Sequence, residues 1–124
     1  MKLHASGEDY LEAILILQKQ MGESAVRSVD LARHMEFSKP SISHAVGVLR
    51  EGGFLSVDVN GYLHLTNTGQ EVAEKIYERH CVLTNGLIQL GVDPKQAEED
   101  ACRMEHVVSD ENFKKLRKIF SQME

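Results

Sequence analysis

Residues 28–53, SVDLARHMEFSKPSISHAVGVLREGG, decide the fold of this chain of 124 residues. Apolar residues recur with helical spacing over residues 28–37, and the Ser38 and Pro40 that follow are typical of a helix start, because serine caps free backbone N–H groups and proline fits the first turn. The next helix ends at Gly52 and Gly53. Two short helices joined by so tight a turn predict a helix-turn-helix. The side chains expected to face inward are Val29, Leu31, Ala32, Met35, Ile42, Val46 and Leu49.

The following stretch, FLSVDVNGYLHLT (residues 54–66), predicts a β-hairpin. Apolar and polar side chains alternate around Asn60-Gly61, a dipeptide suited to a two-residue turn because it tolerates positive φ. The helix pair alone is equally consistent with an ordinary solvated surface. A hairpin placed directly after it is a wing, and the combination favours DNA binding.

The second helix of the pair is the expected recognition helix, whose N-terminal end enters the major groove. Its short polar side chains can donate hydrogen bonds to phosphates or base edges, and the cations around it supply charge for backbone contacts. The predicted DNA-binding residues are Arg27, Ser38, Lys39, Pro40, Ser41, Ser43, His44 and Arg50, with Arg33 as a further cation.

Four further helices are predicted from apolar periodicity and capping residues. The fold class is therefore mainly α, with a winged helix-turn-helix DNA-binding domain over residues 1–70 and a helical domain over residues 71–124. The helices run from residue 8 to 20, from Thr66 or Thr68 to about residue 90, from Asp93-Pro94 onward, and from Ser109 to about residue 122, the last with an apolar stripe of Phe113, Leu116, Ile119 and Phe120.

Charge and composition constrain the class of protein. The formal net charge of -5 argues against a general affinity for polyanions, so DNA binding needs a local basic patch or neutralisation of carboxylates. No apolar run is long enough to cross a membrane and no secretion signal opens the chain, which predicts a soluble cytoplasmic protein. In a reducing cytosol, Cys81 and Cys102 are expected to stay unpaired.

The stretch DACRMEHVVSDE (residues 100–111) places Cys102, Glu105 and His106 at spacings of three and four. Such spacings put side chains on one face of a helix, where a thiolate, a carboxylate and an imidazole can share a divalent cation. The alternative is a small core cysteine with an ordinary polar pair at its rim. More ligands are needed to decide between the two.

Further candidate ligands are weak signals by themselves. Asp9 and Glu12 lie three residues apart, on one face of the first helix, where two carboxylates are by default solvated. His80 stands in the long helix next to Cys81, and a lone helical histidine is more often a surface or packed residue than a ligand.

The whole chain from about Gly7 resembles the diphtheria toxin repressor and manganese transport regulator family. The resemblance is carried by EDYLEAI (8–14), FSKPSISHAV (37–46), LTNTG (65–69) and ACRMEHVVSDE (101–111). It implies a metal-activated homodimer that represses metal homeostasis genes by binding palindromic double-stranded operator DNA, and a short form without the SH3-like domain of longer members.

The resemblance also implies the metal ligands Asp9, Glu12, His80, Cys102, Glu105 and His106. Iron-type members have methionine at the position of Asp9, and manganese-type members have glutamate at the position of Cys102, so the site is a hybrid. At a second, ancillary site of iron-type members, Thr84 and Glu98 replace glutamate and histidine. Thiolate and carboxylates together favour Fe²⁺ or Mn²⁺, one or two per subunit, with Co²⁺, Ni²⁺ or Zn²⁺ as substitutes.

Two alternative functions would also use Cys102. A small metalloenzyme or cysteine hydrolase would use Cys102 with His106, but the chain has no nucleophile elbow, HExxH or phosphate-binding glycine loop. A thiol-based redox regulator would sense oxidation through Cys81 and Cys102.

Overall fold

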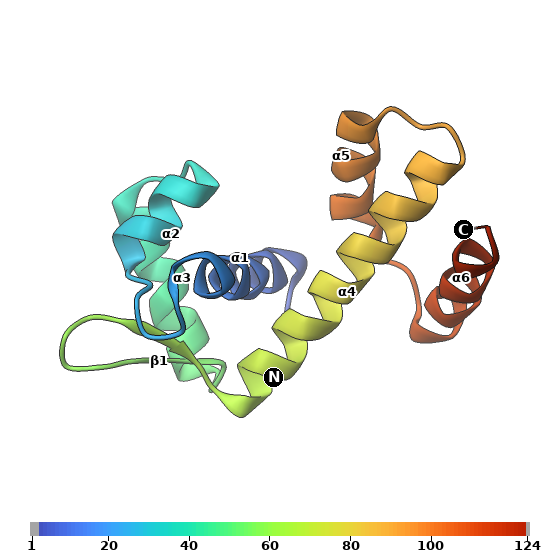
Figure 1. Ribbon diagram of the computed structural model, residues 1–124. Coiled ribbons are helices and arrows are strands. Elements are labelled where there is room, and N and C mark those ends of the chain that lie inside the picture. The colour runs from blue at the N-terminus through green and yellow to red at the C-terminus, as the bar shows by residue number, and fades with distance from the viewer. Residues whose placement is uncertain (1–2, 124) are drawn as a thin grey trace. The chain divides into compact units, whose positions relative to one another are not determined.

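A computed structural model describes residues 3–123 and is mainly helical, with one two-stranded sheet (Figure 1). The chain divides into two compact units, Met1–Glu74 and Lys75–Glu124. The predicted fold class, a winged helix-turn-helix followed by helices, is confirmed. The elements in chain order are α1 (Ala5–Met21), α2 (Ser28–Met35), α3 (Lys39–Glu51), β1 (Leu55–Val57), β2 (Leu63–Leu65), α4 (Asn67–Gln89), α5 (Pro94–Met104) and α6 (Asp110–Gln122).

The first unit packs α1, α2, α3 and the hairpin around one apolar core. Leu11 and Ile14 of α1, Leu31 of α2 and Ile42 of α3 are each completely buried. Burying one such side chain stabilises a fold by about 1.5–3 kcal/mol. The predicted inward position of Val29 is wrong, since it is 43% exposed; it lies roughly 200° around the helix from Leu31.

The turn of the helix-turn-helix is fixed by its caps. Helix α2 ends at Met35, two residues earlier than predicted, because Glu36 adopts a left-handed conformation with φ of 57°. The Phe37 N–H then donates to the Ala32 carbonyl at 3.1 Å. The Ser38 hydroxyl oxygen accepts from the Ser41 N–H at 3.3 Å, as the prediction of a cap at Ser38 required.

The wing is an antiparallel hairpin in which Leu55 pairs with Leu65. The prediction of a two-residue turn is wrong. Only Gly61 of the Asn60-Gly61 pair has a positive φ, and the Gly61 N–H donates to the Asp58 carbonyl at 3.0 Å, which makes a three-residue loop with glycine at the left-handed position.

Asp58 organises this loop with its side chain. It accepts hydrogen bonds from the backbone N–H groups of Asn60 (2.9 Å) and Tyr62 (3.0 Å), and His64 Nε2 lies 2.8 Å from its second oxygen. The hydrogen bonds from His64 and then from Tyr62 hold the pKa of Asp58 below its usual range. The wing therefore keeps an ionised anchor at neutral pH.

The entry to α4 is joined to the exit from α3. The Thr66 hydroxyl donates to the Gly53 carbonyl at 2.6 Å and accepts from the Gly69 N–H at 3.1 Å. Thr66, rather than the alternative Thr68, is thus the cap. A Cβ atom built on Gly69 would lie 1.9 Å from the Phe54 carbonyl oxygen, so the backbones approach too closely for any side chain.

The second unit packs α5 and α6 against α4 (Figure 1). The caps of α5 and α6 are Asp93 and Ser109, as predicted. The prediction that Ile119 belongs to the buried stripe of α6 is wrong, since Ile119 is 55% exposed and only Phe113, Leu116 and Phe120 of that stripe pack in or against the core. None of the helices described is long and apolar enough to cross a membrane. The core consists of Leu83, Ala101, Phe113 and Phe120, with Val82, Met104, Val108 and Leu116 at its edge.

Candidate metal centre and nucleic-acid interface

A cluster of metal-ligand side chains lies in the second unit, where the end of α5 meets α4. His80 Nδ1 lies 3.0 Å from Glu105 Oε2 and 3.7 Å from Cys102 Sγ. One candidate ligand atom from each of the three lies within 4.8 Å of the other two. Two ligand atoms of one transition-metal ion lie about 3–4.5 Å apart, given metal–ligand bonds of about 2.0–2.3 Å. The three groups therefore suit a shared cation with small adjustments.

The backbone around Glu105 differs from the predicted continuous helix. The last helical residue of α5 is Met104, Glu105 is its C-cap, and His106 follows in a turn. Its imidazole nevertheless reaches Glu105, with His106 Nε2 3.5 Å from Glu105 Oε1. Glu105 thus stands between two imidazoles, one on each carboxylate oxygen, and the Cys102 thiol lies on the His80 side.

The burial of Glu105 is a further observation that favours a cation at its carboxylate. The Glu105 side chain is fully buried, with an exposed fraction of 0%, and its Oε1 has no hydrogen-bond partner within residues 3–123. A buried carboxylate without full compensation is costly, whereas a cation would supply the missing charge and coordination. The chemistry of these donors fits a divalent transition metal.

The remaining predicted ligands lie on α1 in the first unit. Asp9 is half-buried, and Glu12 is only 7% exposed. The default expectation of a solvated carboxylate is therefore wrong for Glu12. Of the two ancillary positions, Thr84 has a buried hydroxyl without a hydrogen-bond partner in the described part of the chain, whereas Glu98 is exposed.

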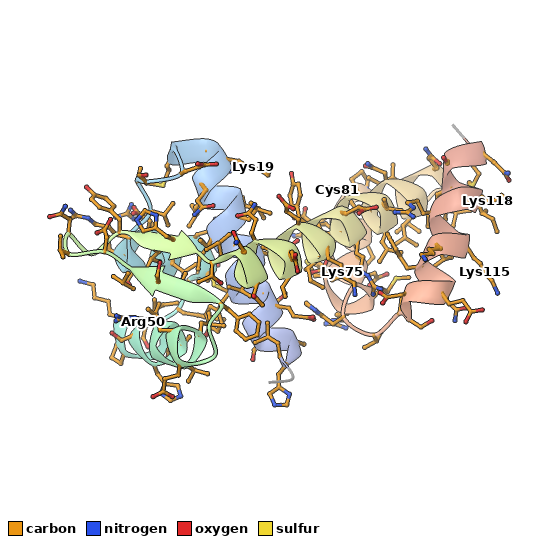
Figure 2. The ribbon with its side chains drawn as sticks, turned by 90° about the horizontal axis from the view of Figure 1, so that it is seen from below. Lys19, Arg50, Lys75, Cys81, Lys115 and Lys118 are labelled. Atoms are coloured by element: carbon orange, nitrogen blue, oxygen red, sulfur yellow. The ribbon has the colours of Figure 1, made fainter. Side chains whose placement is uncertain are left out.

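The predicted nucleic-acid residues mostly form an exposed surface on and beside α3. Ser38 is engaged as the cap of α3 and also donates its hydroxyl hydrogen to Ser41 Oγ at 2.9 Å. Arg27 lies over the ring of Tyr62, 4.3 Å from its centroid, which holds this cation at the wing. Arg50 is exposed near the end of α3, where Figure 2 labels it. Also exposed are Lys39, Pro40, Ser41, Ser43 and His44.

Two residues of interest were not predicted. Gly47 lies exposed in the middle of α3, and a Cβ atom built on it would meet nothing within 4 Å. The available signal in the sequence was an isolated glycine inside a helical pattern. Arg79 is 5% exposed, a rare state for a charged residue. Its position beside His80 gave no such signal.

Comparisons with known proteins agree with this architecture. Residues 2–65 match the family description "Iron dependent repressor, N-terminal DNA binding domain", and residues 66–124 match "Iron dependent repressor, metal binding and dimerisation domain". Transcriptional regulator MntR of Escherichia coli O157:H7 is 35% identical over 115 residues, which cover 93% of this chain and 72% of the relative. Diphtheria toxin repressor of Corynebacterium diphtheriae is 30% identical, covering 94% of this chain and 51% of the relative.

Solved structures give the same picture. A manganese-dependent transcriptional repressor in complex with manganese matches with a TM-score of 0.82 and 26% identity, covering 93% of this chain and 52% of that one. The manganese regulator SloR matches with a TM-score of 0.81 and 28% identity. The chain spans about half the length of these two structures. The matches support a regulator and not the alternative of an enzyme. This chain belongs to the iron-dependent repressor family, whose members are metal-dependent transcriptional repressors.

Proposed function

We propose that this chain is a homodimeric repressor that binds palindromic operator DNA in the cytoplasm when Fe²⁺ or Mn²⁺ is bound, and so controls metal homeostasis genes. The observation that carries the proposal is the fully buried Glu105, with an imidazole facing each oxygen and one oxygen lacking a hydrogen-bond partner among the residues that the structure describes. The winged helix and the exposed surface of α3 support the DNA-binding part of the proposal.

The proposed ligands come from both units. His80, Cys102, Glu105 and His106 would hold the ion from the second unit, joined by Asp9 and Glu12 from α1. The bound cation supplies positive charge that compensates these carboxylates. With ligands from both units, metal loading would favour one arrangement of the dimer, in which the recognition helices are spaced by about 34 Å for successive major grooves. A ligand shifts such an equilibrium only through its differential affinity for the two states.

The donor set supports the choice of metal. Carboxylates suit Mn²⁺ and Fe²⁺, while the Cys102 thiolate favours softer ions such as Fe²⁺, Co²⁺ and Zn²⁺. Fe²⁺ and Mn²⁺ are the proposed physiological ions, one or two per subunit. We assign DNA binding to residues 1–70, and metal binding with dimerisation to residues 71–124.

Metal-dependent DNA binding is the direct test. The protein is titrated with operator-containing duplexes from its own genome, with Mn²⁺ or Fe²⁺ (the latter without oxygen) and with a chelator. We expect affinity to rise at least about tenfold with metal, or by about 1.4 kcal/mol, which lies within the typical range of about 1–3 kcal/mol for coupling free energies. Mg²⁺ at the same concentration is the control. Equal affinity with metal and with chelator would contradict the proposal.

Gly47 gives a test of the DNA-binding surface. A glycine in a helix interior costs about 0.5–1 kcal/mol relative to alanine, and no neighbour in the described structure requires its absence of a side chain. Gly47→Ala should therefore raise the free energy of unfolding by that amount. If the DNA backbone or bases approach α3 at this point, the same substitution should weaken operator binding at least about fivefold. Denaturant unfolding and DNA titration measure the two effects. Undiminished DNA affinity would exclude a close approach here, and metal affinity, measured in parallel, should not change.

A further inference from the structure

Arg79 is a buried cation on α4, next in sequence to His80, and its hydrogen bonds over residues 3–123 go to residues of the second unit. The Arg79 guanidinium Nη1 donates to the Glu105 carbonyl at 3.1 Å and to the Val108 carbonyl at 2.5 Å. Its Nη2 donates to Asp110 Oδ1 at 2.5 Å. The planar fork of a guanidinium suits several acceptors at once, which a lysine ammonium cannot reproduce with the same geometry. Arg79 therefore binds both ends of the turn that links α5 to α6.

This turn carries the deepest part of the candidate metal centre. The last carbonyls of a helix have no partners within it, and α5 ends at the segment that contains Glu105 and His106. Arg79 supplies donors to the carbonyls of Glu105 and Val108, on either side of His106. The backbone that presents these two side chains is thereby tied to the helical turn that presents His80.

The surroundings of Arg79 hold it in place. Its guanidinium lies 5.0 Å from the centroid of the Phe113 ring. Lys75, one turn earlier on α4, places its ammonium 2.9 Å from the same Asp110 oxygen, and the hydrogen bond and charge of Lys75, with a further contribution from Arg79, lower the pKa of Asp110. Arg79 thus keeps an ionised partner as well as two carbonyl acceptors.

We propose that Arg79 is a positioning residue of the metal centre: it fixes the 105–108 backbone so that Glu105 and His106 meet His80 in one geometry, without touching the ion itself. The inference rests on the proposed function, since it concerns the same site. Residues that orient metal ligands commonly contribute 10–100-fold to metal affinity. Arg79 would act on both affinity and coordination geometry, whereas a residue that only stabilises the fold would leave the geometry of the loaded site unchanged.

Arg79→Lys is the test, with Co²⁺ as the probe because its visible absorption reports coordination geometry and thiolate ligation. The variant keeps the positive charge but loses the planar set of guanidinium donors. We expect Co²⁺ affinity to fall by about 10–100-fold and the d–d bands to shift, while the thiolate-to-cobalt band persists because Cys102 lies within α5.

Arg117→Lys is the matched control. Arg117 also lies over the Phe113 ring, at 5.6 Å, and pairs with Glu78 of α4, but it is exposed and, within residues 3–123, donates no hydrogen bond to the carbonyls of residues 105–108. We expect it to bind Co²⁺ like the wild type, with the same spectrum.

The outcomes separate the two proposals. Failure of the wild type to bind Co²⁺ would overturn the proposed function itself. An Arg79→Lys protein that is less stable but binds Co²⁺ with unchanged affinity and spectrum would overturn only the positioning role. If Arg79→Lys does not fold, the positioning role is tested with Phe113→Leu, which removes the aromatic ring that the Arg79 guanidinium contacts. A Co²⁺ complex that is weaker and has an altered spectrum would support the positioning role. Unchanged Co²⁺ affinity and spectrum would overturn it.

Discussion

Glu105→Gln is expected to lower the affinity for Mn²⁺ by more than about 100-fold, above the range for losing a residue that merely orients a ligand. The substitution keeps the shape of the side chain and removes its charge. Operator binding should then no longer respond to Mn²⁺ at concentrations that saturate the wild type. Isothermal titration with Mn²⁺ and DNA titration at fixed metal measure the two losses.

The same variant has a second, opposite signature in the metal-free protein. Because the carboxylate is fully buried and one oxygen has no hydrogen-bond partner within residues 3–123, a neutral amide should raise the unfolding free energy, by about 1 kcal/mol. Glu99→Gln, which removes the same charge from an exposed position on α5, is the control and should change neither quantity. A Glu105→Gln protein with wild-type Mn²⁺ affinity would remove Glu105 from the ligand set.

The second large effect concerns Gly69, at the start of α4. Gly69→Ala is expected to lower the free energy of unfolding by about 2–4 kcal/mol, at or above the usual range for overpacking. The added Cβ would lie 1.9 Å from the Phe54 carbonyl oxygen and 2.9 Å from its carbon. A backbone carbonyl cannot rotate away as a side chain can, and this one also accepts from the Thr66 N–H at 3.2 Å. Urea unfolding monitored by circular dichroism gives the value.

Gly47→Ala serves as the matched comparison for this substitution. Both glycines lie in helices and both variants add one methyl group, but the Cβ at Gly47 meets open space. The two changes in stability should therefore have opposite signs. A loss of less than about 0.5 kcal/mol at Gly69, the level of an ordinary surface substitution, would mean that the entry to α4 moves away from residues 53–54 at little cost.

Local features were predictable from the sequence because their causes are local. Ser38, Asp93 and Ser109 cap the helices that follow them, since a short polar side chain satisfies N–H groups two or three residues away. The errors at Val29 and Ile119 have a different origin. An apolar periodicity shows that a helix has a buried face, but not how far that face extends.

The candidate metal centre could be predicted only in part. The spacing of Cys102, Glu105 and His106 suggested a shared site, but His80 lies 22 residues before Cys102, and no periodicity relates them; the family resemblance supplied that residue. Arg79 was missed for a physical reason. A cation in a polar helix is usually solvated, and its burial follows from the path of the α5–α6 turn, a tertiary feature that helical spacing does not encode.

Exposure falls steadily across the side chains of the second unit's cluster, and this has a kinetic meaning. Cys102 is exposed, the His80 and His106 side chains are 18% and 8% exposed, and Glu105 is 0% exposed. An ion entering the proposed site from solvent would meet the Cys102 sulfur first and the Glu105 carboxylate last. Metal exchange with small-molecule chelators would then begin at the outer thiol, so its rate should respond more strongly to substitution of Cys102 than to substitution of the inner carboxylate.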